Sequence, residues 1–93
     1  MPNLPVVYMK MSELKPGDIG EVVSIDAQGE IAQRIMDMGL IRGTPFKVLR
    51  KAPLGDPLEI KLRGFLLALR IKEAKYISVL SKRNERRHRR RFF

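Results

Sequence analysis

Glycine and proline recur along this 93-residue chain and leave room only for short regular segments. The main breaks lie at Lys15–Asp18, Gly43–Pro45, Pro53–Pro57 and Gly64. Proline does not continue an ordinary helix or central strand, and glycine supplies the backbone conformations that tight turns require. A chain of this length forms one small domain, which buries roughly two-thirds of its unfolded surface. Since 44% of the residues are hydrophobic, we predict a single packed domain built from short elements.

Alternating apolar and polar residues predict five short strands, at residues 19–25, 46–51, 58–63, 65–70 and 76–80. The alternation is cleanest in the third strand, where Leu58, Ile60 and Leu62 are assigned to the core side. Other predicted core pairs, each on one strand face, are Phe46 with Val48 and Ile77 with Val79.

For two of these strands the sequence also predicts which residues are buried. In the first, the period of two places Ile19, Val23 and Ile25 on the core face. Gly20 within it indicates a bulge or a close approach of another backbone. The fourth strand, from Phe65 to Arg70, is mostly apolar, and we predict that it is largely buried.

One helix is expected, over residues 28–38. Ile31, Ile35 and Met38 form an apolar stripe with helical spacing, and Gly39 follows where a helix needs a left-handed residue. Residues 72–75 leave room for one further helical turn. Short strands with glycine and proline corners around a small core favour a closed or half-closed, mainly β barrel. We assign residues 1–11 to an arm or edge strand, 12–81 to the barrel and 82–93 to a basic tail.

The positive charge is concentrated at the C-terminal end. The net charge is +9, of which residues 82–93 contribute +6. The tail has three interpretations: a disordered solubilising end, a phosphate-binding arm for RNA or DNA, or an anchor on an anionic membrane surface with Phe92 and Phe93 at the interface. Its cations are Lys82, Arg83, Arg86, Arg87, Arg89, Arg90 and Arg91.

The sequence offers little for catalysis or metal binding. It has no cysteine, and its one histidine, His88, lies in the basic tail. No phosphate-binding loop or nucleophile motif is present. Met36 and Met38 face different sides of the predicted helix, so they do not form a thioether site. No segment is long and apolar enough to span a membrane, and no secretory signal is evident. We therefore expect a binding module, with no catalytic or metal site.

A family resemblance rests on several short runs in a fixed order. These are Leu14–Asp18, Arg34–Gly43, Pro53–Pro57, Ala68–Arg70 and Ile77–Val79. Together they resemble the ferrous iron transport protein A (FeoA) family over about residues 11–80. The resemblance implies an SH3-like barrel of five to six strands, with one helix inserted after the first strand. It also implies a small prokaryotic cytoplasmic protein, found at times at the inner membrane face.

The resemblance further implies a partner, FeoB, the membrane transporter for Fe(II) with a cytosolic G-protein domain. The family is thought to modulate uptake without doing chemistry of its own. Its domains are often described as binding transition metals, yet residues 1–81 lack the cysteine and histidine for such a site. No cofactor is evident, and Fe(II) enters only as a weakly bound or transported ion. Homo-oligomerisation is left open.

Carried over by position, Gly17, Gly39, Gly43 and Gly64 match the family's turn glycines. Arg34 and Arg70 match its basic positions, as buried pairing residues or as partner contacts. Leu40 and Ile41 either cap the core or mark a docking patch. The predicted partner-binding residues are Arg34, Asp37, Leu40, Ile41 and Arg42. The alternative function is that of a small basic RNA-associated barrel of ribosomal type.

Overall fold

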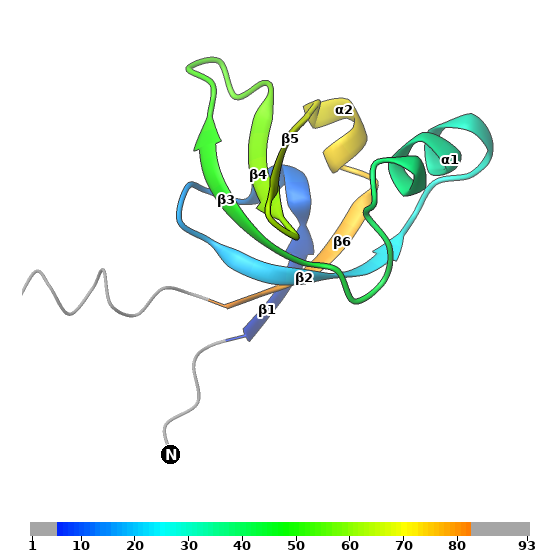
Figure 1. Ribbon diagram of the computed structural model, residues 1–93, viewed down its shortest axis with the longest axis horizontal. Helices are drawn as coiled ribbons and strands as arrows, with labels where there is room; N and C mark the ends of the chain where they lie inside the picture. The colour runs from blue at the N-terminus through cyan, green and yellow to red at the C-terminus, as the bar shows by residue number, and fades with distance from the viewer. Residues whose placement is uncertain (1–5, 83–93) are drawn as a thin grey trace, which may run out of the picture.

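The computed structural model describes residues 6–82, which form one curled antiparallel sheet with two helices and a 3-10 turn (Figure 1). The strand order is β1-β6-β2-β3-β4-β5. The mainly β barrel with an inserted helix is thus confirmed. In chain order the elements are β1 (Val6–Lys10), η1 (Met11–Glu13), β2 (Ile19–Ile25), α1 (Gly29–Asp37), β3 (Pro45–Lys51), β4 (Leu58–Leu62), β5 (Phe65–Leu69), α2 (Ile71–Ala74) and β6 (Ile77–Lys82).

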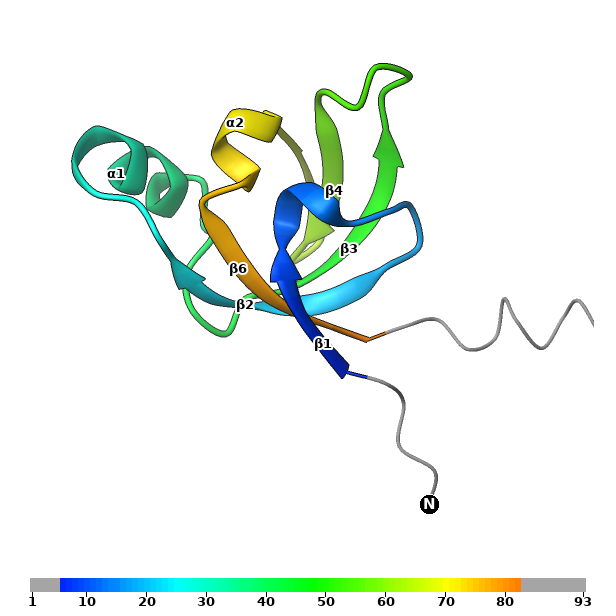
Figure 2. The ribbon, with the colours of Figure 1, turned by 180° about the vertical axis from the view of Figure 1, so that it is seen from behind.

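The first element is a strand at one edge of the sheet. β1 pairs with β6 along its whole length, from Val6 opposite Lys82 to Lys10 opposite Ser78. Seen from behind, β1 and η1 lie across the back of the barrel, beside β6 (Figure 2). Residues 1–5 and 83–93, which include most of the predicted basic tail, lie outside the described residues.

The strand with the clearest alternation of apolar and polar residues, β4, contributes to the core as predicted. Leu58, Ile60 and Leu62 of β4 are buried, with Phe46 and Val48 of β3 beside them. The remaining buried apolar residues are Met11, Leu14, Val22, Ile35, Leu40, Leu69, Ala74, Ile77 and Val79. Of the predicted helical stripe, only Ile35 is fully buried; Met38 packs against the core, and Ile31 is 41% exposed.

The predicted core face of β2 is wrong at two of its three positions. Ile19 is 41% exposed, Val23 is only half-buried, and the fully buried residue is Val22. The third position is confirmed, since Ile25 packs against the core. The pairing with β6 shifts register between Val22 and Ser24. Such an irregularity inserts an extra residue and changes the face that later side chains take. The period of two therefore does not hold across this strand.

The predicted burial of β5 is also wrong. Only Leu69 is fully buried, whereas Phe65 and Leu66 are exposed. The strand lies at the end of the sheet, so β4 covers only one of its sides. An apolar run alone does not distinguish a central strand from an edge strand.

A two-residue turn joins β4 to β5. Leu62 pairs with Phe65, and between them Arg63 and Gly64 both have positive φ, 50° and 86°. Two left-handed residues in this position are typical of a type I′ hairpin turn, which favours asparagine followed by glycine. Arginine in the left-handed region is strained, because its Cβ crowds the backbone.

Replacing Arg63 with asparagine is therefore expected to raise the free energy of unfolding by about 0.5–1 kcal/mol. Chemical denaturation of the two proteins measures the difference. A matched Lys61→Asn change in β4 should give no gain, since asparagine is disfavoured in strands. A variant at Arg63 that is no more stable than the parent would contradict the strain at this turn.

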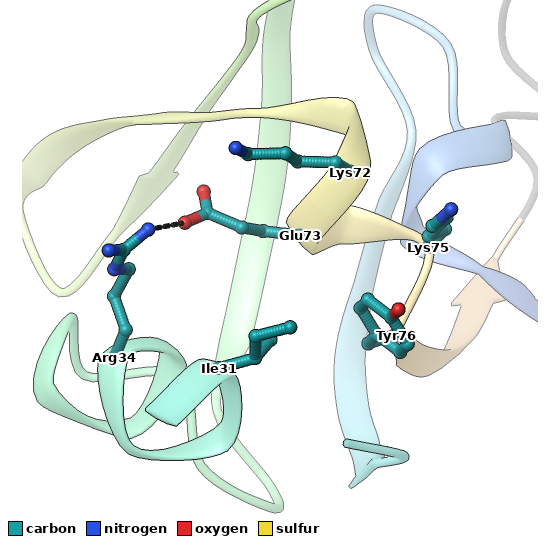
Figure 3. A pocket seen from close by; sticks show the side chains of 6 residues that line it. All are labelled: Ile31, Arg34, Lys72, Glu73, Lys75 and Tyr76. Atoms are coloured by element: carbon teal, nitrogen blue, oxygen red, sulfur yellow. Dashed lines mark hydrogen bonds and ion pairs between the residues drawn. The ribbon is translucent and has the colours of Figure 1, made fainter. Parts of the chain in front are cut away.

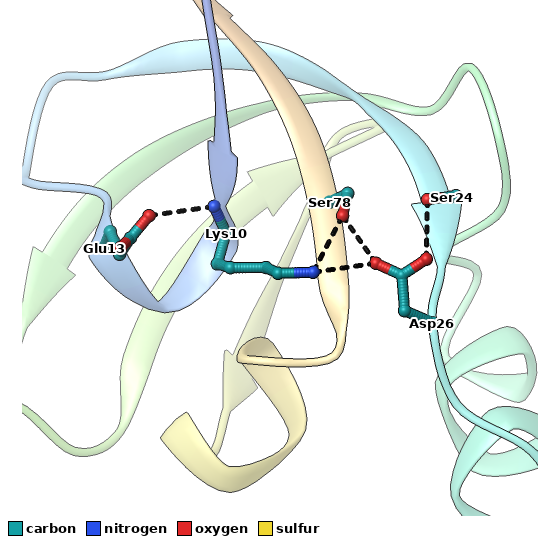
Figure 4. Close-up of polar contacts among 5 residues, drawn as sticks. All are labelled: Lys10, Glu13, Ser24, Asp26 and Ser78. Carbon is teal, nitrogen blue, oxygen red and sulfur yellow. Dashed lines mark hydrogen bonds and ion pairs between the residues drawn. The ribbon is translucent and has the colours of Figure 1, made fainter.

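A polar cluster joins β1, β6 and the end of β2 (Figure 4). The Lys10 ammonium donates to Asp26 Oδ2 at 2.9 Å and to Ser78 Oγ at 3.1 Å, and Ser24 Oγ donates to Asp26 Oδ1 at 2.9 Å. Ser78 also donates a hydrogen bond to Asp26. These contacts, with the Ser78 hydroxyl first and Lys10 and Ser24 next, lower the pKa of Asp26 to about 2.

This lowered pKa predicts a pH-dependent contribution to stability. Ionised Asp26 is favoured in the folded state, so its contribution is complete above the ordinary pKa near 4 and is lost as pH falls toward 2. Asp26→Asn should be less stable than the parent at about pH 6, by less than about 1 kcal/mol because the cluster is partly exposed. Urea unfolding should show the gap closing at about pH 2.5; a gap of constant size would refute this contribution.

Candidate functional site

The loop after α1 is held firmly against the barrel. Thr44 is fully buried; its hydroxyl oxygen accepts from the Ile41 amide at 3.1 Å and donates to the Gly39 carbonyl at 3.3 Å. The Gly43 amide donates to the Val22 carbonyl at 2.7 Å, and Val22 donates back to Thr44 at 2.9 Å. Gly39, with φ of 93°, ends the helix as predicted and lets the chain turn back. The loop is thereby fixed in one shape.

This loop presents an apolar side chain among charged ones. Ile41 is 45% exposed, and Arg42 beside it is exposed, as are Arg34 and Asp37 of α1. Arg34, Asp37, Ile41 and Arg42 are therefore the predicted partner-binding residues that are exposed, and we call their side chains the α1 docking surface. Leu40, which was predicted with them, is fully buried in the core and cannot contact a partner. The Leu40 amide donates to the Ile35 carbonyl at 3.4 Å, so the backbone here is joined to the end of α1.

A groove of about 180 Å³ lies between α1 and α2 (Figure 3). Glu73 stands at its centre and is only 7% exposed. Its Oε2 accepts from Arg34 Nη1 at 3.2 Å, and its Oε1 accepts from the Arg70 amide at 3.3 Å, so the carboxylate joins the two helices. The lining residues are Ile31, Arg34, Lys72, Glu73, Lys75 and Tyr76.

Neither Arg34 nor Arg70 is a buried pairing residue. Arg34 does pair with Glu73, but its side chain is 66% exposed. Arg70 is also exposed, and its contribution is its backbone amide, which is capped by Glu73 at the start of α2. Glu73 belongs to the helical turn predicted at residues 72–75, but it was not among the predicted site residues. The available signal was its spacing of three residues from Arg70, which is that of a helix-capping carboxylate.

Among the described residues, no three histidine, cysteine, aspartate or glutamate side chains come together to hold a metal ion. Within residues 6–82, no helix is long and apolar enough to cross a membrane.

The predicted turn glycines Gly17, Gly39, Gly43 and Gly64 all have positive φ. Lys82 ends β6, while His88 and the cations from Arg83 to Arg91 lie outside the described residues.

A curled six-stranded antiparallel sheet, with a helix between its second and third strands, defines a small SH3-like barrel. The profile of the FeoA domain matches residues 9–80, and the chain belongs to the FeoA family. FeoA proteins are small accessory domains associated with ferrous iron transport. The resemblance inferred from the sequence is thereby confirmed.

Two solved structures show the likeness. The solution structure of FeoA from Chlorobium tepidum is 54% identical, with a TM-score of 0.69 over 76% of this chain and 68% of that one. FeoA from Stenotrophomonas maltophilia, solved with zinc, is 33% identical, with a TM-score of 0.66 over 76% of this chain and 88% of that one. The latter is described as a prokaryotic SH3 domain protein and is suggested to act as a ferrous iron transport activating factor.

A curated relative joins this domain to a transporter. It is the Fe(2+) transport protein A/Fe(2+) transporter FeoB fusion protein of Porphyromonas gingivalis, 34% identical over 71 residues. The match covers 76% of this chain but spans only 8% of that protein's length.

Proposed function

We propose that this chain is a non-enzymatic accessory protein of Fe(II) uptake, which binds the cytosolic part of a FeoB-type transporter and modulates transport. The observation that carries the proposal is the Porphyromonas gingivalis protein, in which a related domain and FeoB share one chain. A covalent tether keeps two modules at high local concentration. Where no tether exists, surface contacts must supply the affinity.

The α1 docking surface supplies suitable contacts. Ile41 offers apolar area, Arg34 and Arg42 offer positive charge, and Asp37 adds a carboxylate. Because Thr44 and Gly43 hold the loop in place, little conformational freedom is lost when a partner binds. Such a partner places the protein in the cytoplasm, at the inner membrane face. The basic tail adds attraction to anionic lipid there.

A role without catalysis agrees with the charged groups of the described residues. Glu73 is paired with Arg34, and the Asp26 carboxylate is held ionised by Lys10, Ser24 and Ser78. The Asp26 carboxylate is therefore not poised to exchange a proton near neutral pH. In this proposal Fe(II) is the cargo of the transporter.

The test is direct binding of the full chain to the purified cytosolic part of the FeoB-type transporter from the same organism. A second protein, with Arg83, Arg86, Arg87, Arg89, Arg90 and Arg91 changed to serine, separates the barrel from the tail. At about 0.3 M salt, which screens exposed charges, both proteins should bind with a Kd in the micromolar range. Absence of binding far above micromolar concentration would refute the proposal. Capture of RNA by the unmodified chain alone would favour the ribosomal alternative.

A further inference from the structure

β5 leaves one side of the sheet open. It is the last strand in the order, beyond β4 (Figure 1). Within residues 6–82 its backbone hydrogen bonds go to β4 alone. Leu62 and Phe65 close a two-residue hairpin, so successive amides alternate between facing β4 and facing away. The amides of Leu66 and Ala68 fall in the outward set.

This edge lacks the usual protection against strand pairing. Natural edge strands carry lysine, proline or a bulge, or they are covered by another segment. The five residues of β5 are all apolar, its pairing with β4 is regular, and Phe65 and Leu66 are 46% and 63% exposed. β1, the opposite edge, ends instead at Lys10, which is tied to Asp26 and Ser78.

Positive charge flanks the open edge. Lys61 lies opposite Leu66, Arg63 precedes the strand, and Arg70 follows it; all three are exposed. The nearby carboxylates already have partners: Glu59 pairs with Arg50 at 3.3 Å, and Asp56 accepts from the Ile71 amide at 3.1 Å. Arginine occupies position 63 although the backbone there has a positive φ, which is unfavourable for this residue. Strain of this kind is commonly retained where a side chain has a function.

We propose that β5 binds an extended segment of a partner protein as a seventh strand of the sheet. The segment carries apolar residues on both of its faces, because Phe65 and Leu66 point to opposite faces of β5. Aspartate or glutamate at its ends meets Lys61, Arg63 and Arg70. Main-chain hydrogen bonds give affinity in this mode, and side chains give selectivity.

A second copy of this chain is a disfavoured partner for β5. Antiparallel pairing of two β5 strands would place Arg63 of one copy near Arg70 of the other, and like charges repel across paired strands. The inference rests on the proposed function, since the segment is assigned to the transporter's cytosolic part.

The experiment uses the full chain and that purified cytosolic part. Ala68→Pro removes one outward N–H, and proline is tolerated on the free side of an edge strand. Ala68→Val is the matched control, which retains the amide. Ala68→Pro should weaken binding roughly tenfold or more, whereas Ala68→Val should stay within about twofold. In the unmodified chain, hydrogen exchange at the Leu66 and Ala68 amides should slow roughly tenfold in the complex.

The exchange measurement does not depend on whether a variant folds. If the complex forms while exchange at Leu66 and Ala68 is unchanged, strand addition is wrong and the proposed function stands. Equal binding by the folded proline and valine variants leads to the same conclusion. If the unmodified chain does not bind the transporter at all, the proposed function fails and this inference falls with it.

Discussion

Replacing Gly20 with alanine is expected to lower the Tm of this protein by about 12–24 °C. An added Cβ at this position would overlap the Leu80 carbonyl oxygen and lie 3.0 Å from the Ser81 Cα. Both atoms belong to the backbone of β6, which is paired with β2 and β1 and has no free space to move into. Forcing extra volume into such a site costs about 3 kcal/mol, and each kcal/mol shifts Tm by about 4–8 °C in a domain of this size.

Thermal unfolding followed by circular dichroism measures this effect. Glu21→Ala is the matched control, because Glu21 is the next residue of β2 and is exposed. Its Tm should change by no more than about 4 °C. A Gly20→Ala protein as stable as this control would mean that β2 and β6 do not approach each other as closely as the structure shows.

Gly20 also illustrates how far sequence reasoning reached. The glycine indicated a bulge or a close backbone approach, and the close approach is what occurs at Gly20. The register shift of this strand lies elsewhere, between Val22 and Ser24. The pattern did not say that Val22, which precedes the shift, would lie in the core while Val23 would be left only half-buried. That choice depends on β6, which lies more than fifty residues further along the chain.

Elements governed by local signals were predicted well. In β4 the strict alternation of Leu58, Ile60 and Leu62 specified both the strand and its core face. The helical spacing and Gly39 specified α1 to within a residue at each end. Here the information lies within one turn or one strand, where a sequence window contains all of it.

Features that depend on tertiary neighbours were missed. The exposure of β5 follows from its place at the end of the sheet, which Phe65 and Leu66 alone do not reveal. Within the candidate site, the ion pair between Arg34 and Glu73 joins residues 39 positions apart. Leu40 and Ile41 are adjacent in sequence, yet one is buried and the other exposed. The loop bonds of Thr44 decide that difference, and no periodicity describes a loop.

Because Ile41 is exposed while Leu40 is buried, the strongest functional prediction concerns Ile41. Ile41→Asp is expected to raise the Kd for the cytosolic part of the FeoB-type transporter by about 30- to 100-fold. A central apolar contact commonly supplies about 2–3 kcal/mol of binding free energy, and a carboxylate in its place must also be desolvated. Because Ile41 is 45% exposed and its amide, not its side chain, makes the loop bond, the fold should be retained.

Leu54→Asp provides the matched control for the loss of an exposed apolar side chain. Leu54 is 97% exposed in the loop between β3 and β4, away from α1 (Figure 1). Calorimetric titration of both variants, with Tm measured alongside, separates a docking defect from unfolding. The docking surface predicts a large loss for Ile41→Asp and a change within about twofold for Leu54→Asp. If both folded variants bind like the parent, the transporter contacts another face of the barrel. If only Leu54→Asp loses binding, the partner docks at the β3–β4 loop, and the α1 docking surface is wrong.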